Sequence, residues 1–266
     1  METEPIKKVS GGKITFITLI CIISAALIYY SIMSMMSPER ELSRLKSLPG
    51  VITDEKNPVD QRIFTDSAYL KMLRQKSFLQ SRSLMAETDS IYFIVNLSDS
   101  TANLEISGVS VHGAKIKSFR ISSILMKGDE YPILTMLSTP LTIANSFATI
   151  KKEPVMIKMA PKDTSEYKPD VMPDTSIVEP VNFKLEMTNG IILYVYQEEK
   201  EKAADRISFR RFDISDRVTD TWNSVKSVTQ FKIPQYHPFI KLIIPRSDAK
   251  IIYRALPKKG QIAVYR

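Results

Sequence analysis

Cysteine is almost absent from this sequence, and this limits the chemistry available to the chain. Of 266 residues only Cys21 is a cysteine, and it lies inside a long apolar run. Because no cysteine follows it, the rest of the chain cannot contain a disulfide and must be held together by a hydrophobic core. A hydrophobic content of 44% and a charged content of 25% fit a globular protein with such a core.

Histidine is also scarce, which leaves few ligands for a metal ion. The chain has two, His112 and His237, and without a usable cysteine they make a zinc site an unfavoured interpretation. The sequence has no acidic calcium loop, no glycine-rich phosphate loop and no Gly-x-Ser-x-Gly elbow. Its carboxylates are scattered, and Asp213, Asp216 and Asp220 are interpreted as charges that favour the start of a helix. We therefore predict no metal and no cofactor.

Charge is missing from residues 14–36, which read ITFITLICIISAALIYYSIMSMM. As a helix with a rise of 1.5 Å per residue, this run is about 34 Å long, and the hydrocarbon core of a bilayer is about 30 Å thick. Lys7, Lys8 and Lys13 precede it and favour an N-terminus in the cytoplasm. We expect a cytoplasmic tail at residues 1–13 and one transmembrane helix at 14–36.

A cleaved signal peptide is the alternative interpretation of this run, with Ser24-Ala25-Ala26 as the small-residue site. Cleavage there would leave an exposed apolar N-terminus, so we favour the uncleaved anchor. The region after residue 36 is expected outside the cytoplasm, where nucleic acid is not a partner.

The outer region has an excess of positive charge. The chain carries a formal net charge of +8, and residues 1–13 contribute three lysines and two glutamates, which leaves +7 for the remainder. Such a surface suits anionic lipid headgroups or carboxylate-bearing wall polymers. A solvated lysine-rich surface explains the same excess equally well.

Residues 37–88 are expected to form a helical juxtamembrane segment. Ser37-Pro38-Glu39 is typical of a helix start, with Ser37 as the N-cap and Pro38 at the first helical position. A second helix is predicted over about 67–86, where apolar side chains recur at helical spacing. We favour packing of this helix on the domain's own sheet over a stalk or a partner-binding helix.

Residues 89–266 are expected to form a β-rich domain. Short strands are indicated by β-branched and aromatic runs at 91–97, 103–107, 109–111 and 116–121. The clearest hairpin covers Phe183 to Tyr196, where Asn189-Gly190 predicts a type I′ turn with two positive-φ residues. His112 is interpreted as a surface or strand-edge residue.

Three further segments complete this domain. Residues 162–180 are rich in Pro, Asp, Ser and Thr and indicate a surface loop. Residues 207–209 are interpreted as another strand. A helix that begins at Asp213 or Ser215 is expected to pack an apolar stripe into the core; the stripe consists of Val218, Trp222, Val225 and Val228.

The last thirty residues have a distinctive order of elements. Residues 239–244 predict an apolar strand that ends at Pro245, and Ser247 is a suitable N-cap for a helix from 248 to about 256. Pro257-Lys258-Lys259-Gly260 indicates a turn, and a final strand is expected at 261–265.

This order resembles the catalytic end of the L,D-transpeptidases that cross-link bacterial peptidoglycan. There a Ser-His-Gly-Cys-Ile-Arg-Leu run precedes a proline, an Asp-Ala-Lys helix with a Leu-Tyr pair, and a closing strand. Four positions here match that run: His237, Pro238, Phe239 and Lys241. His237 corresponds to the motif histidine and Lys241 to the arginine, whereas Pro238 replaces the glycine and Phe239 replaces the nucleophilic cysteine.

The resemblance extends beyond the motif. Asp248-Ala249-Lys250, with Tyr253, matches the helix, and Ser138-Thr139-Pro140 with the segment 147–154 is similar to the family's Thr-Pro segment and following strand. Glycine, however, makes up only about 3% of this chain, against about 7% on average. The glycine-rich active-site loops of the family are therefore missing.

The resemblance implies a mainly β fold with short helices (α+β), an L,D-transpeptidase-like β-sandwich preceded by one transmembrane helix. It also implies the loss of the family's chemistry, because acyl transfer there requires a thiolate and Cys21 lies in the apolar run. His237 is then expected to be a hydrogen-bonded structural residue, and no catalytic residue is predicted.

We expect a single-pass protein of the bacterial cytoplasmic (inner) membrane with its C-terminal domain outside the cytoplasm. As a catalytically inactive member of that family, it would be a scaffold for other cell-envelope proteins or a peptidoglycan-binding module. Two alternatives remain open: an unrelated β-rich subunit of an envelope assembly, and a hydrolase with relocated catalytic residues.

Overall fold

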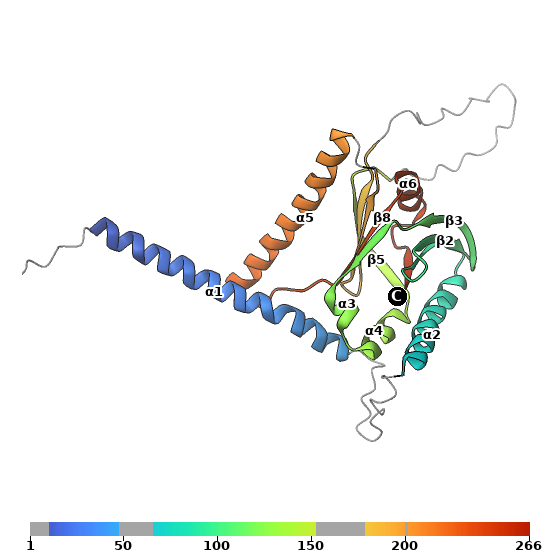
Figure 1. Cartoon of the computed structure of the whole chain (residues 1–266), viewed down its shortest axis with the longest axis horizontal. Helices are drawn as coiled ribbons and strands as arrows, with labels where there is room; N and C mark the ends of the chain where they lie inside the picture. Colours follow the sequence, from blue (N-terminus) through green and yellow to red (C-terminus); the bar gives the residue numbers. More distant parts are fainter. Residues whose placement is uncertain (1–10, 48–65, 153–178, 200–201) are drawn as a thin grey trace, which may run out of the picture. The chain divides into compact units, whose positions relative to one another are not determined.

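The computed structural model describes residues 11–47, 66–152, 179–199 and 202–266 (Figure 1). The chain divides into two compact units. The first comprises residues 1–44 and 216–236, and the second comprises 45–215 and 237–266. The predicted surface loop at 162–180 lies almost entirely outside the described residues, as do most of the cytoplasmic tail and the middle of the predicted juxtamembrane segment.

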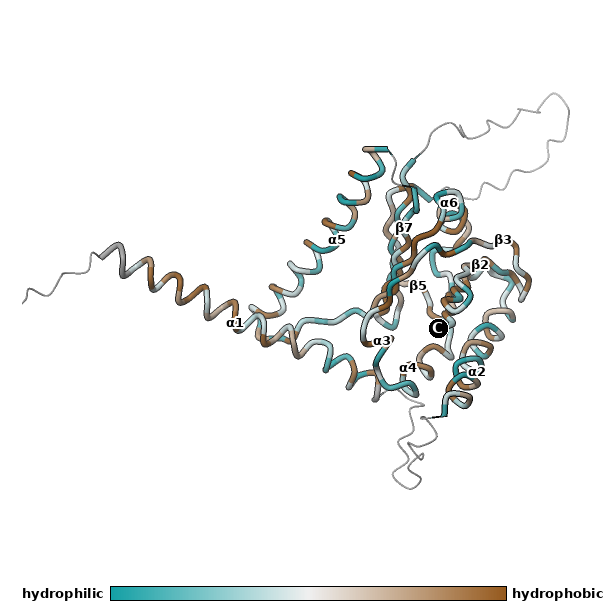
Figure 2. The backbone as a smooth tube through the Cα atoms, viewed as in Figure 1, coloured by the Kyte–Doolittle hydropathy of each residue, from teal (hydrophilic) through white to brown (hydrophobic). Residues whose placement is uncertain are grey.

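The first unit is dominated by α1, Gly11–Lys46, whose apolar colouring is visible in Figure 2. It is the one helix in the described part of the chain that is long and apolar enough to cross a membrane, a property that an N-terminal signal sequence shares. The prediction of a helix start at Ser37 is wrong, because α1 continues through Pro38. Its last turns are stabilised by Arg44, which donates to the Glu41 carboxylate at 2.5 and 2.8 Å.

The same unit contains the end of α5, Ala203–Thr229, and the segment that follows it. Ser37 Oγ donates to the carbonyl oxygen of Pro234 at 2.7 Å, and this bond is buried. The rings of Tyr29 and Phe231 have their centroids 6.0 Å apart. Residues 231–234 therefore contact α1 near the C-terminal end of its apolar run.

The second unit is built on a nine-stranded mixed sheet in the order β3-β2-β1-β9-β5-β6-β7-β8-β4. Its strands are β1 Tyr92–Asn96, β2 Thr101–Ile106, β3 Val109–Lys115, β4 Ser118–Ile121, β5 Leu141–Ala148, β6 Asn182–Met187, β7 Ile192–Gln197, β8 Phe239–Ile244 and β9 Gln261–Tyr265. The early strands, the hairpin strands and the two C-terminal strands lie where the sequence predicts them. The strand after Pro140 is displaced, because it runs over β5 and not over 147–154.

The sheet must curl on itself. Its two outer strands, β3 and β4, are consecutive in the chain and are separated only by Ile116 and Lys117. Ile116 N donates to Ser100 O and Lys117 N donates to Ile243 O, both at 2.8 Å, so the link is hydrogen-bonded on both sides. The ends of the strand order consequently lie close together, and the central strands β1, β6, β7 and β9 are buried along most of their length.

Helices cover this sheet. The second helix, α2, Ser67–Ala86, has the predicted bounds, and Asp66 Oδ1 accepts from Ala68 N to cap it. Its buried Met85 packs with Tyr92, Ile94 and Ala263, so the expected packing on the domain's own sheet is confirmed (Figure 1). Two helices that the sequence did not predict, α3 Ser123–Lys127 and α4 Glu130–Leu137, lie between β4 and β5. The C-terminal helix α6, Arg246–Ala255, begins after Pro245, and Ser247 is not its N-cap.

The α+β class is confirmed, but the expectation of short helices is wrong. Helix α5 has 27 residues and includes the predicted strand at 207–209. Its start at Ala203 also lies well before Asp213. The aromatic and β-branched composition of 207–209 is typical of a strand. In the structure these residues are helical, and the rings of Phe209 and Phe212 pack on one face of the helix against Tyr196.

The β6–β7 hairpin has a different turn from the predicted one. Gly190 has φ +91°, whereas Asn189 is not among the residues with positive φ. Gly190 N donates to Met187 O at 3.0 Å, and Ile191 N donates to Asn189 Oδ1 at 3.2 Å. The asparagine side chain thus supports an ordinary turn, and only the glycine occupies the left-handed region.

We predict that Gly190→Ala lowers the free energy of unfolding by about 1–2 kcal/mol, because an L side chain in the left-handed region clashes with the following carbonyl. Thermal unfolding of the full-length protein in detergent, followed by circular dichroism, measures this loss. Thr188→Ala, at an exposed position of the same turn, is the matched control and should change stability by less than about 0.5 kcal/mol.

Candidate functional site

Of the four motif positions, His237 and Pro238 immediately precede β8, and Phe239 and Lys241 share one of its faces. β8 pairs in parallel with β7, so that Phe239 is opposite Ile192 and Lys241 is opposite Tyr194. Every second side chain along a strand points to the same face of the sheet. On this face the two strands and α5 form one apolar cluster, which contains Ile192, Tyr194, Tyr196, Phe209, Phe212, Phe239 and Ile243.

Lys241 lies at the centre of that cluster. Its Nζ is 3.5 Å from Asp213 Oδ1 on α5, and the Tyr196 hydroxyl donates to the same carboxylate oxygen at 3.3 Å. Nζ also lies 4.6, 5.5 and 5.7 Å from the ring centroids of Tyr194, Phe239 and Tyr196, in the range of cation–π attraction. We call Lys241, Asp213 and these three rings the Lys241 cluster.

His237, Pro238 and Phe239 are held by backbone contacts. His237 Nδ1 is 3.2 Å from Gly190 O, and the imidazole is otherwise exposed. Pro238 is buried, and its carbonyl accepts from Ile192 N at 2.8 Å. The carbonyl of Phe239 accepts from Ser122 N at 2.9 Å. These bonds fix the start of β8 between β7 and β4, which is a structural role for the segment.

The second histidine is on β3. His112 Nε2 lies 3.3 Å from Asp248 Oδ1 at the start of α6, and both side chains are partly exposed. β3 is an outer strand of the sheet, so the expected strand-edge position is confirmed. Among the described residues, no group of three or more His, Cys, Asp and Glu side chains is arranged to hold a metal ion.

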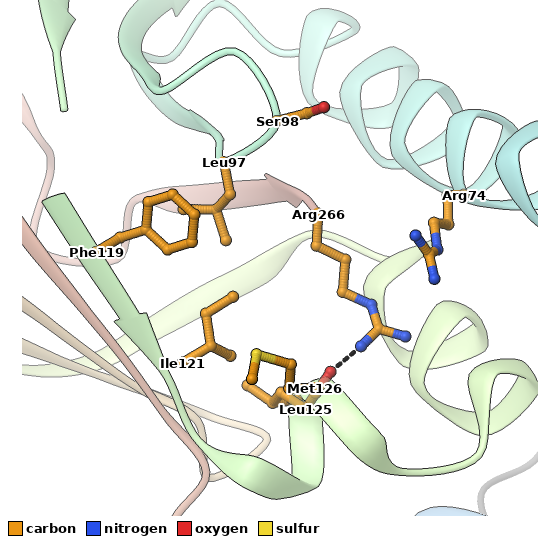
Figure 3. A pocket seen from close by; sticks show the side chains of 8 residues that line it. All are labelled: Arg74, Leu97, Ser98, Phe119, Ile121, Leu125, Met126 and Arg266. Carbon is orange, nitrogen blue, oxygen red and sulfur yellow. Dashed lines mark hydrogen bonds between the residues drawn. The ribbon is translucent and has the colours of Figure 1, made fainter.

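A cavity of about 290 Å³ opens elsewhere on the same unit. Figure 3 shows its lining, which comes from α2, the end of β1, β4, α3 and the C-terminal residue: Arg74, Leu97, Ser98, Phe119, Ile121, Leu125, Met126 and Arg266. Most of the wall is apolar, and the two guanidinium groups lie at one side. No sequence pattern indicates this cavity, because its residues are scattered over five segments that only the fold brings together.

One carboxylate serves both guanidinium groups of this cavity. Glu130 accepts from Arg74 and from Arg266, each at 2.5 Å, and Arg266 also donates to the carbonyl oxygen of Leu125. The Arg266 side chain is only 10% exposed, and burial lowers the pKa of its guanidinium. Burial alone would raise the pKa of Glu130, but the hydrogen bond from Arg74 and the charge of Arg266 outweigh it and hold this pKa below its usual value.

We predict that Lys241→Ala lowers the free energy of unfolding by roughly 1–3 kcal/mol, because it uncovers three rings and leaves Asp213 without its cation. Chemical denaturation of the full-length protein in detergent measures this loss. Lys259→Ala, in the exposed turn before β9, is the matched control and should have an effect below about 0.5 kcal/mol. An equal effect of both substitutions would contradict a structural role for Lys241.

We also predict that Glu130→Gln destabilises the protein by about 1–3 kcal/mol near neutral pH and by much less in acid. A carboxyl whose pKa is lower in the folded state stabilises the fold above its unfolded pKa, here about 4.5, and this contribution is lost as pH falls through the folded value. Melting temperatures between about pH 7 and pH 3 test this prediction. Glu87→Gln, at an exposed position, is the control and should follow the wild-type curve.

No protein-family model, no curated protein and no solved structure matches this chain. The role of the site is therefore inferred from the contacts of its own residues. Two of the motif positions, Phe239 and Lys241, belong to a lysine–carboxylate–aromatic cluster, and the cavity at Arg74 and Arg266 has its cations bound to Glu130.

Proposed function

We propose that this chain is a single-pass membrane protein of the bacterial cell envelope with a non-catalytic, L,D-transpeptidase-like domain outside the cytoplasm. The domain acts as a scaffold for other envelope proteins or binds peptidoglycan. The observation that carries the proposal is the side chain at position 239. A phenyl ring stands where the family has its nucleophile, and this ring belongs to the Lys241 cluster.

The succession of C-terminal elements supports the family resemblance. β8 is followed by Pro245, α6, a turn with Gly260 and β9, which is the order that the resemblance implies. Tyr253 and Ala249, which match the family helix, are buried in α6, and the Tyr253 ring packs 5.1 Å from that of Phe183. The matched residues thus supply packing of the helix on the sheet.

The absence of a nucleophile supports a non-catalytic role. Acyl transfer in this family needs a thiolate, and the one cysteine of the chain lies in the apolar part of α1. His237 is near the carbonyl oxygen of Gly190, and Lys241 is bound by Asp213 and the rings. The polar groups of the old motif are therefore used to stabilise the fold.

The most direct test uses full-length protein in detergent, incubated with disaccharide-tetrapeptide fragments of peptidoglycan. Mass spectrometry should detect neither a cross-linked dimer nor loss of a terminal residue from the stem. The His237→Ala variant is the control for relocated chemistry. A product formed by the wild type and absent with this variant would show that the domain is an enzyme.

Binding is measured separately by co-sedimentation of the same protein with purified sacculi. Retention identifies the domain as a peptidoglycan-binding module. If the protein stays in the supernatant, the scaffold role remains, and chemical crosslinking in intact membranes should then capture neighbouring envelope proteins. A protein that neither sediments nor crosslinks would contradict both forms of the proposal.

A further inference from the structure

Helix α5 has an apolar face that the described residues leave exposed. The expectation that this stripe packs into the core is wrong: among its four predicted members only Val228 is buried. Together with Ile207 and Ile214, which the prediction did not include, the three exposed members lie at spacings of seven, four, four and three residues, which is one face of a helix. They are Ile207 (64% exposed), Ile214 (58%), Val218 (61%), Trp222 (70%) and Val225 (38%). Brown segments recur along this helix in Figure 2.

The other face of α5 explains why the stripe is not part of the core. Phe209 and Phe212 lie roughly half a turn away from the stripe, and their rings pack against Tyr196 with centroids 5.0 and 6.1 Å apart. Asp213 on that side contacts Lys241. The first half of the helix is thus fixed to the sheet by this face, and its exposed Ile207 and Ile214 lie on the other side of the helix.

Acidic and basic residues of α5 also lie on different sides of the helix. At about 100° per residue, Asp213, Asp216 and Asp220 fall on the side opposite the stripe. Four of the exposed basic residues flank the stripe or lie within it, at Arg210, Arg211, Arg217 and Lys226, whereas Arg206 lies about 120° from its centre. An apolar face bordered by arginine and lysine, with carboxylates on the far side, is complementary to an anionic lipid surface.

The end of α5 is next to the candidate membrane span. Phe231 is 81% exposed, and its ring lies beside Tyr29 of α1. Ser37, one residue beyond the apolar run 14–36, is hydrogen-bonded to Pro234. Tyr29 is seven residues before the end of that run, about 10 Å along a helix, so Phe231 lies beside the outer part of the apolar run. The bond between Ser37 and Pro234 places the segment that follows α5 at the end of the apolar run, where the bilayer interface is expected.

We propose that the exposed face of α5 lies on the surface of the bilayer that α1 spans, with Trp222 and Phe231 in the interfacial region and the flanking basic residues on anionic headgroups. This inference rests on the membrane anchor of the proposed function. α5 then has two attachments, to the sheet by the aromatic face of its first half and to lipid by its stripe.

The chain contains one natural probe for the position of α5 and one for the membrane anchor. Trp222 is its only tryptophan and Cys21 its only cysteine. The experiment uses full-length protein reconstituted into sealed vesicles of phosphatidylcholine and phosphatidylglycerol, with nitroxide-labelled lipids added. An interfacial helix buries its apolar face about 5–10 Å into the headgroup and acyl boundary. Trp222 should therefore be quenched more strongly by a nitroxide near the top of the acyl chain than by one near its end, and only weakly by aqueous acrylamide.

Val218→Glu, in the stripe, should reduce lipid quenching of Trp222 at least severalfold and restore quenching by acrylamide. Asn223→Glu adds the same charge at an exposed position on the opposite side and should leave both unchanged. A stripe covered by a second copy or another protein would shield Trp222 from acrylamide without quenching by lipid, and this result would overturn the inference. Equal behaviour of the two variants would overturn it as well.

Reaction of Cys21 with a membrane-impermeant maleimide distinguishes a failure of the surface position of α5 from a failure of the membrane anchor. Unreactive Cys21 together with water-exposed Trp222 would overturn the surface position of α5 and leave the anchor intact. Reactive Cys21 in sealed vesicles would overturn the anchor, and the inference with it. Unreactive Cys21 together with lipid-quenched Trp222 is the expected result.

Discussion

Two strands from the last thirty residues hold the sheet together. β9 lies between β1 and β5, and β8 lies between β7 and β4. Without them the hydrogen-bonded order would fall into β3-β2-β1, β5-β6-β7 and the isolated β4. Four pairings depend on this short segment, two of them parallel. Parallel partners are not joined by a tight turn, so the sheet can be completed only when the end of the chain has been inserted.

Because β8 and β9 are inserted between other strands, many side chains of the C-terminal segment are buried. Leu242, Ile244 and Ile262 are buried completely or nearly so, and α6, between the two strands, buries Ala249, Ile252 and Tyr253. The outward side of β8 is covered by the Lys241 cluster and by the first half of α5. A segment that resembles a catalytic motif therefore has a sufficient physical role without catalysis.

Sequence patterns predicted the elements whose signals are local. The bounds of α2, the early strands, the hairpin strands and the β8–α6–β9 succession follow from apolar periodicity and from proline and glycine. Asn189-Gly190 predicted the hairpin but not its turn, because the asparagine side chain bonds to the backbone at Ile191 and leaves positive φ to the glycine alone. The apolar helix α1 was predicted too, although its continuation through Pro38 was not.

Other features could not be predicted because they depend on distant residues. Residues 207–209 favour a strand by composition, yet their helix is fixed by ring contacts with Tyr196 on another strand. The stripe of α5 has the periodicity of a core helix, and only the fold shows that its opposite face already packs on the sheet. The cavity at Arg74 and Arg266 has no motif, since Glu130 joins cations that lie far apart in the sequence.

If the motif segment stabilises the fold, Lys241 and Asp213 must contribute to stability as a pair. A double-mutant cycle with Lys241→Ala and Asp213→Ala measures their coupling in the unfolding free energy of the full-length protein. We predict a favourable coupling of about 1 kcal/mol or more, as found for residues in contact within one network. Additive effects, with a coupling below about 0.3 kcal/mol, would contradict the structural role of the cluster.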